Sequence, residues 1–304
     1  MPTSRRSFLR KTSVLIAGSG LLSRQVFAAA AKEHITGIQL YSVRDDMRKD
    51  PLATLKALSD MGYRYVEHAN YVNRKFYGYT AADFKKVLAD NGLKMPSGHT
   101  VMGRDHWDAT KKEFSDSWKY TVEDAAAVGQ ELVISPWLDE NLRKNYDDMK
   151  RYMEVFNKSG ELCRKSGMRF GYHNHNFEFT QKLNDTLVYD IILESTDPSL
   201  VTQQLDIGNL YSTGANALEI VKKHPGRFVS LHVKDETKSA QSKEIGSGYE
   251  STVLGTGVAN TKAITDEARK LGTTHFIIEQ ESYQGKAPID AVSEDLKVMK
   301  SWGY

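Results

Sequence analysis

Short apolar runs rich in β-branched and aromatic residues alternate along the chain with longer segments of helical periodicity. From Ile35 onward this alternation repeats eight times, and the strands we expect cover residues 37–43, 65–69, 93–99, 132–137, 169–175, 201–206, 228–233 and 276–281. Strands that alternate with helical segments are typical of βαβ units, in which a helix joins two parallel strands. The pattern therefore predicts an α/β fold with a parallel sheet.

The ends of the expected helices carry repeated marks. A glycine precedes six of the strands, at Gly62, Gly92, Gly129, Gly167, Gly226 and Gly272. Glycine adopts the left-handed conformation that ends many helices, so these positions indicate six helix stops. Proline fits the first helical turn, so Pro51 and Pro288 mark two helix starts.

Eight strand-helix pairs within about 270 residues match the size of one (β/α)8 TIM barrel. A doubly wound open sheet is the alternative fold, but it needs a glycine-rich first β-to-α turn, and residues 40–44 contain no glycine. No linker or internal boundary interrupts the pattern, so we expect one TIM-barrel domain over residues 31–304. The longest irregular segment, residues 235–260, follows the seventh strand, and loops of that length usually serve a site.

Residues 1–30 have the features of an export signal. A basic segment with Arg5, Arg6 and Arg10 precedes a short apolar run at residues 14–22, and residues 28–30 are alanines that suit cleavage. The run S-R-R-x-F-L-R resembles a twin-arginine signal, which implies the twin-arginine export machinery as a partner and a periplasmic location. An uncleaved anchor or a lipid-attached form is the alternative, although no cysteine lies near the cleavage region to carry lipid.

Composition narrows the classes of partner. The 304 residues include 41 basic and 39 acidic residues, but five of the basic ones lie in the first thirty, and the rest of the chain has net charge −3. A slightly acidic body argues against nucleic acid or an anionic membrane as the main partner. No segment beyond the signal approaches eighteen apolar residues, so we expect no stable membrane insertion after processing. The single cysteine, Cys163, excludes a disulfide scaffold and is expected to be a buried helix residue.

Polar residues gather where the expected strands end, which is where TIM barrels place their chemistry. In strand order these residues are Gln39, Tyr41 and Arg44; Glu67 and His68; His99; Trp137; the run 172–178 (YHNHNFE); Gln204 and Asp206; His232 and Lys234; and Glu279 and Glu281. Carboxylates and imidazoles inside a barrel are costly unless they bind a cation or line a wet pocket. A mixed nitrogen and oxygen set suits Mn, Co, Fe, Zn or Mg rather than a structural zinc, which usually recruits thiolates.

These segments resemble the sugar isomerase/epimerase superfamily with the xylose isomerase-like barrel. The resemblance runs from Ile35 to Tyr304 and rests on GIQLYSVR (37–44), YHNHNFEF (172–179), QLD (204–206), LHVKD (231–235), LGTGV (254–258) and IEQE (278–281). It implies one divalent ion, most often Mn, held by Asp206, His232 and Glu279. On strand five the chain has His173 where ketose epimerases of the family place a glutamate, so we assign His173 as the fourth ligand, with Glu178 as a rival. The YHNHxxEF branch resembles proteins that act on keto-sugars and inosose-like substrates rather than on phosphorylated sugars.

Such a site supports removal of a proton from a carbon next to a carbonyl, with the ion stabilising the enediolate. His175, expected on the same strand face as His173, is the first candidate for the catalytic base, and Glu178 and Glu279 are alternatives. The substrate-binding residues we expect are Gln39, Tyr41, Arg44, Glu67, His99, Trp137, Gln204 and Lys234, with Trp137 offering an apolar face to the ring. For Arg44 and Glu67, a simple ion pair at the rim is the alternative role.

The fate of the enediolate decides the activity. We expect a metal-dependent isomerase or epimerase acting on a non-phosphorylated sugar, and β-elimination from a 3-keto-glycoside (a lyase or hydratase) is the alternative on the same site. A non-catalytic periplasmic sugar-binding protein would keep aromatics and lose the metal-binding set. A metal nuclease of the AP-endonuclease type would need a basic DNA groove, which the net charge disfavours. A homo-oligomer is possible, and the periodicity identifies no interface.

Overall fold

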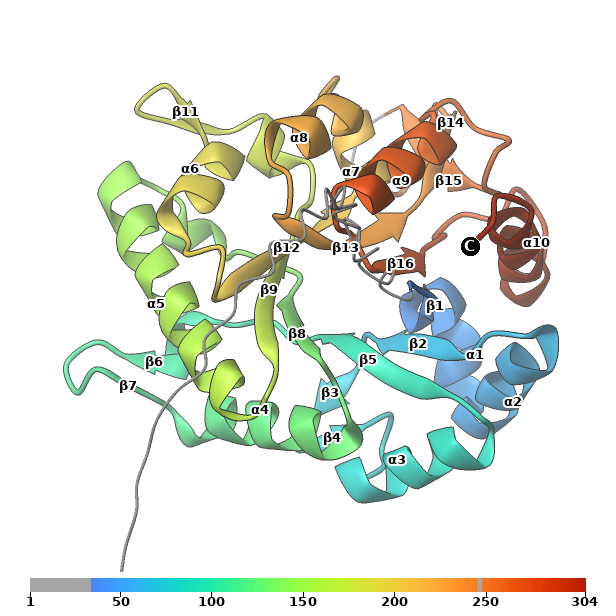
Figure 1. The fold of residues 1–304 in the computed structure, drawn as a ribbon, viewed down its shortest axis with the longest axis horizontal. Coiled ribbons are helices and arrows are strands. Elements are labelled where there is room, and N and C mark those ends of the chain that lie inside the picture. Colours follow the sequence, from blue (N-terminus) through green and yellow to red (C-terminus); the bar gives the residue numbers. More distant parts are fainter. Residues whose placement is uncertain (1–33, 245–247) are drawn as a thin grey trace, which may run out of the picture. The chain divides into compact units, whose positions relative to one another are not determined.

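Eight parallel strands close into a barrel in the computed structural model, which describes residues 34–244 and 248–304 (Figure 1). In chain order the strands are β1 (Ile35–Gln39), β2 (Tyr65–His68), β5 (Lys94–His99), β8 (Leu132–Ser135), β9 (Arg169–His173), β12 (Val201–Asp206), β13 (Phe228–Val233) and β16 (His275–Ile278). β16 pairs with β1 in parallel, with Ile35 opposite His275, and this pairing closes the ring. The predicted (β/α)8 barrel is confirmed, and the open sheet is excluded. The predicted export signal, residues 1–30, lies outside the described residues.

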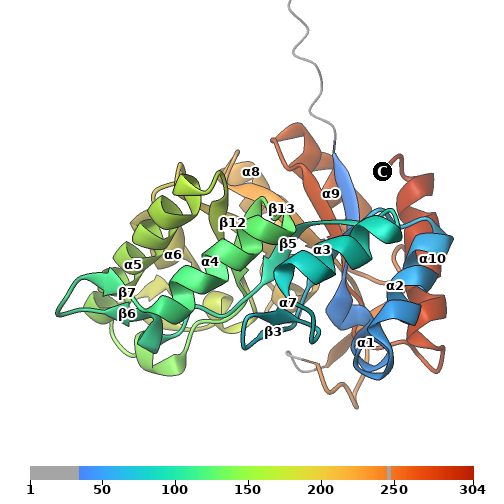
Figure 2. The ribbon, with the colours of Figure 1, turned by 90° about the horizontal axis from the view of Figure 1, so that it is seen from below.

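Helices surround the strands on the outside of the barrel (Figure 2). The longer ones are α2 (Pro51–Met61), α3 (Ala81–Asp90), α4 (Asp116–Val128), α5 (Tyr146–Lys165), α6 (Val188–Ser195), α8 (Ala217–Lys223), α9 (Thr261–Lys270) and α10 (Pro288–Ser301). Two short helices, α1 (Arg44–Lys49) and α7 (Ile207–Tyr211), and four 3₁₀ turns, η1 (Leu40–Val43), η2 (Arg104–His106), η3 (Glu140–Leu142) and η4 (Phe177–Phe179), lie in the loops. The six glycines predicted as helix stops all have positive φ, between 64° and 106°, and α2 and α10 begin at the predicted prolines.

Small antiparallel hairpins lie in four of the loops that follow barrel strands. They are β3 (Tyr71–Val72) with β4 (Lys75–Phe76), β6 (Trp107–Asp108) with β7 (Glu113–Phe114), β10 (Lys182–Leu183) with β11 (Thr186–Leu187), and β14 (Asp235–Lys238) with β15 (Tyr249–Thr252). The last of these occupies part of segment 235–260, which we had expected to be irregular. Because all four follow the carboxyl ends of barrel strands, they build up the end of the barrel that carries the site.

Five strands are shorter at their carboxyl ends than the sequence predicted, and the smallest difference is at β2, which ends at His68 instead of residue 69. β1 ends at Gln39, β8 at Ser135, β9 at His173 and β16 at Ile278. Tyr41, Trp137, His175 and Glu281 therefore lie in the loops beyond the strands, and the expected alternation does not place His175 on the same strand face as His173. The cause at β1 is local, since the Gln39 side chain accepts a hydrogen bond from the Tyr41 backbone N–H and starts the 3₁₀ turn η1.

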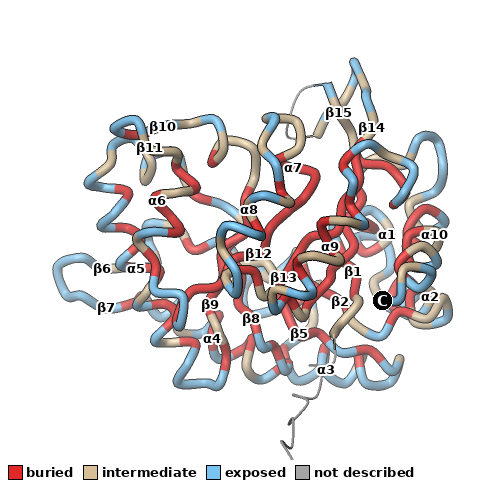
Figure 3. Tube along the Cα trace, turned by 45° about the horizontal axis from the view of Figure 1, so that its top comes forward, coloured by how far each residue is buried: buried red, intermediate tan, exposed pale blue. Residues whose placement is uncertain are grey.

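Burial follows the barrel (Figure 3). The strands are buried almost throughout, and the apolar core lies between them and the inner faces of the helices. Cys163 is among these core residues, on α5, as predicted. In the described part of the chain, no helix combines the length and the apolarity needed to cross a bilayer.

Gly160 is where α5 approaches the chain leading into β12 most tightly. A Cβ atom at this position would lie 2.6 Å from the Leu200 carbonyl oxygen and 2.8 Å from the Leu200 Cβ. Backbone atoms have little freedom to move away, so the helix packs here only because residue 160 lacks a side chain.

We expect Gly160→Ala to lower the free energy of unfolding by about 1–3 kcal/mol, because overpacking outweighs the higher helix propensity of alanine. Urea unfolding followed by circular dichroism measures this change. The control is Glu161→Ala, at the exposed neighbouring position on α5, which should change stability by less than about 0.5 kcal/mol. A stabilised Gly160→Ala variant would contradict the close contact.

Candidate active site

Three buried side chains from adjacent strands converge at the carboxyl end of the barrel. Asp206 ends β12, His232 lies on β13, and Glu279 follows β16, so the barrel order brings together residues that are far apart in sequence. His232 Nδ1 lies 3.1 Å from Glu279 Oε2 and 3.7 Å from Asp206 Oδ2. Asp206 and His232 are fully buried, and Glu279 is 7% exposed. One ligand atom from each residue lies within 4.8 Å of the others, so the three could hold one metal ion.

The donor set fits a divalent cation. Asp206 Oδ2 is buried and has no hydrogen-bond partner among the described residues, while its Oδ1 accepts from the Asn209 backbone N–H at the start of α7. Burial raises the pKa of Glu279. In Asp206 the charges of Lys234 and His232 outweigh burial and lower the pKa. A buried carboxylate oxygen with no partner is costly, and a bound cation would satisfy it.

His173, at the end of β9, points into the same centre. Its Nδ1 lies 3.0 Å from Gln204 Oε1, and its Nε2 lies 3.9 Å from Asp206 Oδ2. An amide oxygen that accepts from Nδ1–H leaves the lone pair of Nε2 to accept from a donor or to bind a metal. In this structure Nε2 lies 3.5 Å from Asn209 Nδ2. Glu178, the rival at this position, is buried elsewhere: its carboxylate accepts hydrogen bonds from the Tyr172 hydroxyl and the His175 backbone N–H. The structure thus places His173, and not Glu178, beside Asp206.

Glu67 supports the metal centre from below. Its Oε1 lies 2.6 Å from His232 Nε2 and also accepts from Gln39 at 2.8 Å, while its Oε2 accepts from Gln204 at 2.9 Å. An imidazole whose Nε2–H is bonded to a carboxylate presents Nδ1 to a metal. Burial opposes a charge on His232, but Glu279 and Glu67 outweigh it and raise its pKa. Glu67 therefore fixes which nitrogen of His232 faces Asp206 and Glu279.

Three residues expected to contact the sugar are instead part of this support. Gln39, Glu67 and Gln204 have no exposed surface, and all their partners named above are protein groups. The expectation that they hydrogen-bond substrate hydroxyls is replaced by a structural role. The sequence placed them correctly at strand ends but did not show that a second layer of side chains lies above them.

Lys234 is also buried, within a group of carboxylates. It pairs with Glu281 and lies 3.6 Å from Glu279 Oε2 and 3.7 Å from Glu244 Oε2. These carboxylates outweigh the burial and raise the pKa of Lys234. Because the ammonium group is enclosed, Lys234 acts on the cavity only through Glu279 and Glu281, which line it.

Arg44 is likewise tied to the protein. It begins α1, and its guanidinium donates to the Tyr283 hydroxyl at 3.0 Å and to the Glu281 carbonyl at 3.2 Å. It lines a smaller neighbouring cavity of about 360 Å³. The alternative role, an ion pair with Glu67, does not form, because the Glu67 carboxylate is bonded to Gln39, Gln204 and His232. Arg44 joins the loop after β16 to η1, and so positions the wall that contains Glu281.

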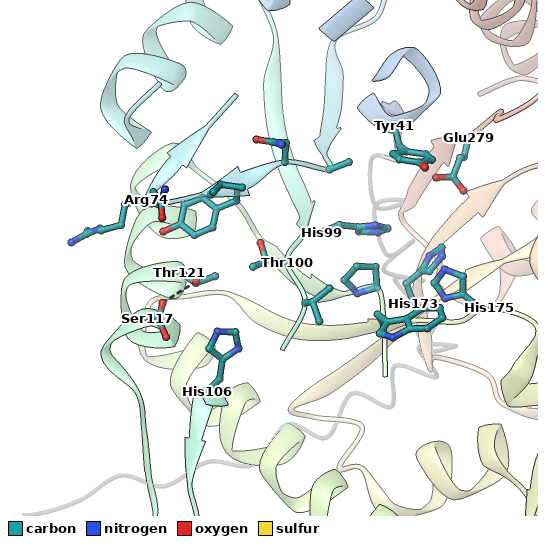
Figure 4. A pocket seen from close by; sticks show the side chains of 18 of the residues that line it. Tyr41, Arg74, His99, Thr100, His106, Ser117, Thr121, His173, His175 and Glu279 are labelled. Carbon is teal, nitrogen blue, oxygen red and sulfur yellow. Dashed lines mark hydrogen bonds between the residues drawn. The ribbon is translucent and has the colours of Figure 1, made fainter. Parts of the chain in front are cut away.

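A cavity of about 740 Å³ opens above the metal centre (Figure 4). Its inner end is lined by Tyr41, His99, Trp137, His173, His175, Glu279 and Glu281. Tyr41 and Trp137 are 42% and 38% exposed, so both rings are open to a ligand, as a contact to a sugar requires. His99 reaches the cavity while its Nε2 lies 2.7 Å from Gln204 Oε1.

Two of the predicted base candidates, His175 and Glu279, line this cavity. Glu279 is bonded to His232, whereas the His175 ring forms no such bond with any residue that the structure describes. Its Nδ1 is buried and has no hydrogen-bond partner within the described ranges 34–244 and 248–304. Its ring lies edge-on to Trp137 at 5.0 Å and to His173 at 5.1 Å. Burial lowers the pKa of His175 to about 4, so the imidazole is neutral near pH 7 and is able to accept a proton.

Two supporting residues were missed by the sequence reasoning. Asn174 joins β9 to β12, since its Oδ1 accepts from the Asp206 backbone N–H at 3.0 Å, and Asn209 lies 3.4 Å from Lys234 Nζ. Asn174 lies between the two histidines of the HNH run, and this position was a usable signal.

Asp235 accounts for the LGTGV segment, residues 254–258. Its carboxylate accepts hydrogen bonds from the backbone N–H groups of Gly255, Gly257 and Ala259.

Residues 55–302 match the family described as xylose isomerase-like TIM barrel. The chain belongs to this family. The predicted resemblance to sugar phosphate isomerases and epimerases is confirmed at this level.

Individual relatives refine this assignment. An inosose dehydratase of Bacillus licheniformis is 26% identical over 192 residues, which are 58% of this chain and 63% of that protein. The chain thus matches less than two thirds of the length of the first curated relatives. A sugar phosphate isomerase/epimerase of Parabacteroides distasonis is 27% identical, with a TM-score of 0.71 over 88% of this chain and 98% of that one. The IolI protein, whose structure holds a zinc atom, shares the fold at 12% identity, with a TM-score of 0.68 over 88% and 97%.

We expect Glu67→Gln to weaken metal binding about tenfold, because the amide is a poorer acceptor for His232 Nε2–H and no longer fixes the ring. Competition with a fluorescent chelator measures the affinity. Glu154→Gln, an exposed charge on α5, is the matched control and should leave the affinity unchanged. Equal affinities for Glu67→Gln and the control would contradict the supporting role.

Asp206→Asn tests the metal centre itself. The amide oxygen can still accept from Asn209 N–H and keep the start of α7, while the charged ligand is lost. We expect the protein to remain folded and to purify with far less than one equivalent of divalent metal, measured by inductively coupled plasma mass spectrometry. Full metal content in Asp206→Asn would place the ion elsewhere.

Proposed function

We propose that this protein is a divalent-metal-dependent lyase that eliminates a β-leaving group from a non-phosphorylated keto-sugar, such as a 3-keto-glycoside or an inosose-like ring. The observation that carries the proposal is the His175 imidazole, which lines a cavity whose inner end is the candidate metal centre and whose buried Nδ1 has no hydrogen-bond partner in residues 34–244 and 248–304. A base, a metal-binding set and an aromatic wall thus meet in one space.

Asp206, His232 and Glu279, with His173 as the fourth ligand, would hold the ion. When bound there, a divalent ion polarises a ketone oxygen and stabilises negative charge on it. Manganese is the ion we favour, with Co, Mg, Zn or Fe as alternatives. The preference for manganese rests on the family resemblance, while the mixed imidazole and carboxylate donors suit all of these ions.

His175 performs the proton transfers. Its imidazole takes the proton from the carbon next to the carbonyl, and the C–H electrons move toward the carbonyl. When the electrons return, a carbon–carbon double bond forms and the β C–O bond breaks. The imidazolium of His175 then gives its proton to the departing oxygen, which leaves as water or an alcohol. Tyr41 and Trp137 hold the ring during these steps, because both are exposed on the cavity wall.

One free base favours elimination over epimerisation. An epimerase that works by two bases needs groups on opposite faces of the substrate, and here strand five provides His173, while Glu178 is bonded to Tyr172 and His175. The inosose dehydratases among the relatives are named for an elimination. The second candidate function is an isomerase or epimerase, favoured by the likeness to the Parabacteroides distasonis protein over most of the chain.

The surroundings of the enzyme form part of the proposal. The twin-arginine-like run at residues 4–10 supports export of the folded, metal-loaded protein to the periplasm. Glycosides are common there, while phosphorylated sugars are not, which agrees with a non-phosphorylated substrate.

The test is turnover of a small panel of keto-glucosides and inososes by the Mn-loaded protein in deuterated water, followed by NMR. We expect an unsaturated keto-sugar and a released alcohol, or dehydration of the inosose. His175→Gln should lower turnover by 10²- to 10⁴-fold at unchanged metal content, and His224→Gln, at the end of α8, is the control. A product with an intact skeleton and solvent deuterium next to the carbonyl would instead establish the isomerase. Metal-loaded protein that gives neither product nor exchange would refute both.

A further inference from the structure

The cavity extends well beyond the metal centre. Figure 4 shows Tyr41, His173, His175 and Glu279 at one end and Arg74, His106, Ser117 and Thr121 at the other, with His99 and Thr100 between them. The outer end is built by the β3–β4 hairpin, the loop after β5, η2 and the start of α4. A total of about 740 Å³ lies in the range that encloses a ligand larger than one monosaccharide ring.

The outer wall is held in place by one carboxylate. Asp124 on α4, 8% exposed, accepts from Arg74 Nε at 3.0 Å, from Arg74 Nη2 at 2.8 Å and from the Tyr71 hydroxyl at 2.6 Å. The Arg74 guanidinium also lies 4.1 Å from the centre of the Tyr120 ring. These contacts fasten the hairpin to α4, so the wall exists before any ligand arrives.

The turn of this hairpin has an uncommon backbone conformation. Its two turn residues, Asn73 and Arg74, both have positive φ, 51° and 61°. Such a turn matches the twist of a two-residue hairpin but usually contains glycine, which an arginine side chain replaces here. Non-glycine residues in this conformation cluster at ligand clamps and active sites. The contacts of the Arg74 side chain with Asp124 and Tyr120 on α4 offset the cost of this conformation.

The outer end has the surface chemistry of a site for an uncharged ring. Tyr120, Val72 and Val101 are 39%, 57% and 43% exposed and line it, together with the hydroxyls of Ser117 and Thr121 and the amide of Asn70. Arg74, the cation of this wall, uses the Nε and Nη2 edge of its guanidinium for Asp124, so this edge is not available to grip a phosphate or carboxylate. Aromatic faces with scattered hydroxyls suit a second sugar ring or an aryl group.

We propose that the outer end of the cavity, formed by Tyr120, Val72, Val101 and the Arg74–Asp124 clamp, binds the leaving unit of a two-ring glycoside. The inference rests on the proposed function: the inner ring is the keto-sugar at the metal centre, and the outer ring is what departs. The C–H bond next to the ketone and the C–O bond to the outer ring break, a carbon–carbon double bond forms, and the outer unit leaves as an alcohol carrying the proton. Tyr120 is thus a specificity-determining residue.

The experiment compares methyl 3-keto-glucoside, which has one ring, with phenyl 3-keto-glucoside and 3-keto-cellobiose, which have two. We expect the Mn-loaded protein to have a higher kcat/KM for 3-keto-cellobiose than for the methyl glycoside. Phenol leaves more easily than an alcohol for chemical reasons, so for the phenyl glycoside only the part of the advantage that Tyr120→Ala removes is assigned to the outer site. Tyr120→Ala should lower the ratio of two-ring to one-ring kcat/KM roughly five- to tenfold, mainly through KM. Lys119→Ala, which precedes Tyr120 on α4 and does not line the cavity, should preserve the ratio.

Equal kcat/KM for one-ring and two-ring substrates, or an equal loss on both in Tyr120→Ala, would overturn the outer site. If no keto-glycoside is turned over, calorimetry with the unoxidised glycosides tests the outer site alone, and the proposed function itself fails when the inososes are not dehydrated either. Phenyl glucoside or cellobiose should then bind more tightly than methyl glucoside to the wild type and lose this advantage in Tyr120→Ala. No advantage in the wild type would overturn the inference. Asp124→Asn, which loosens the clamp while keeping every lining side chain, should lower the same ratio in the same direction.

Discussion

The imidazole of His232 lies between carboxylates on both of its ring nitrogens, and the floor of the barrel is organised around this buried arrangement. Glu67 is 2.6 Å from Nε2, and Glu279 is 3.1 Å from Nδ1. Charges without water are tolerated only when each has a partner, and removing one partner leaves the other uncompensated. The buried amides of Gln39 and Gln204 and the ammonium of Lys234 complete the pairing. Asp206 Oδ2 is the exception among these charged groups, because no donor in residues 34–244 and 248–304 forms a hydrogen bond with it. This unsatisfied oxygen is the strongest structural argument for a cation.

This pairing separates the site into two layers with different tasks. The lower layer, with Glu67 and Gln204, is enclosed and fixes the orientation of His232 and His173. The upper layer, with Tyr41, Trp137 and His175, faces the cavity. A rigid lower layer holds the metal-binding atoms close to productive geometry without help from the substrate, which is what preorganised catalysis requires. The upper layer is free to define the substrate.

The loops beyond the strands enlarge the site away from the metal centre. The β3–β4 hairpin and the start of α4 form the outer wall, and the contacts of Asp124 with Tyr71 and Arg74 hold the two together. Barrel enzymes vary their chemistry and specificity through these loops while the strands stay the same. The candidate metal ligands thus come from the barrel strands and their ends, whereas the outer end of the cavity is built by the loops of this chain.

The sequence alone determined the architecture, because apolar periodicity and glycine stops depend on local backbone preferences: Gly62 and Gly272 end helices for reasons that a few neighbouring residues contain. It also placed Asp206, His232 and Glu279 at one end of the barrel, since parallel strands all end on the same side. It did not show where strands β9 and β16 stop, because polar residues continue past the last ladder bond. Only the tertiary structure decided that Glu67 supports His232, that Glu178 turns away to Tyr172, and that Arg74 contacts Tyr120 in the outer wall of the cavity. The contacts of Glu67 and Arg74 join distant segments, and that of Glu178 lies within residues 172–178. In each case a residue's type and position along the chain do not specify which partner its side chain reaches.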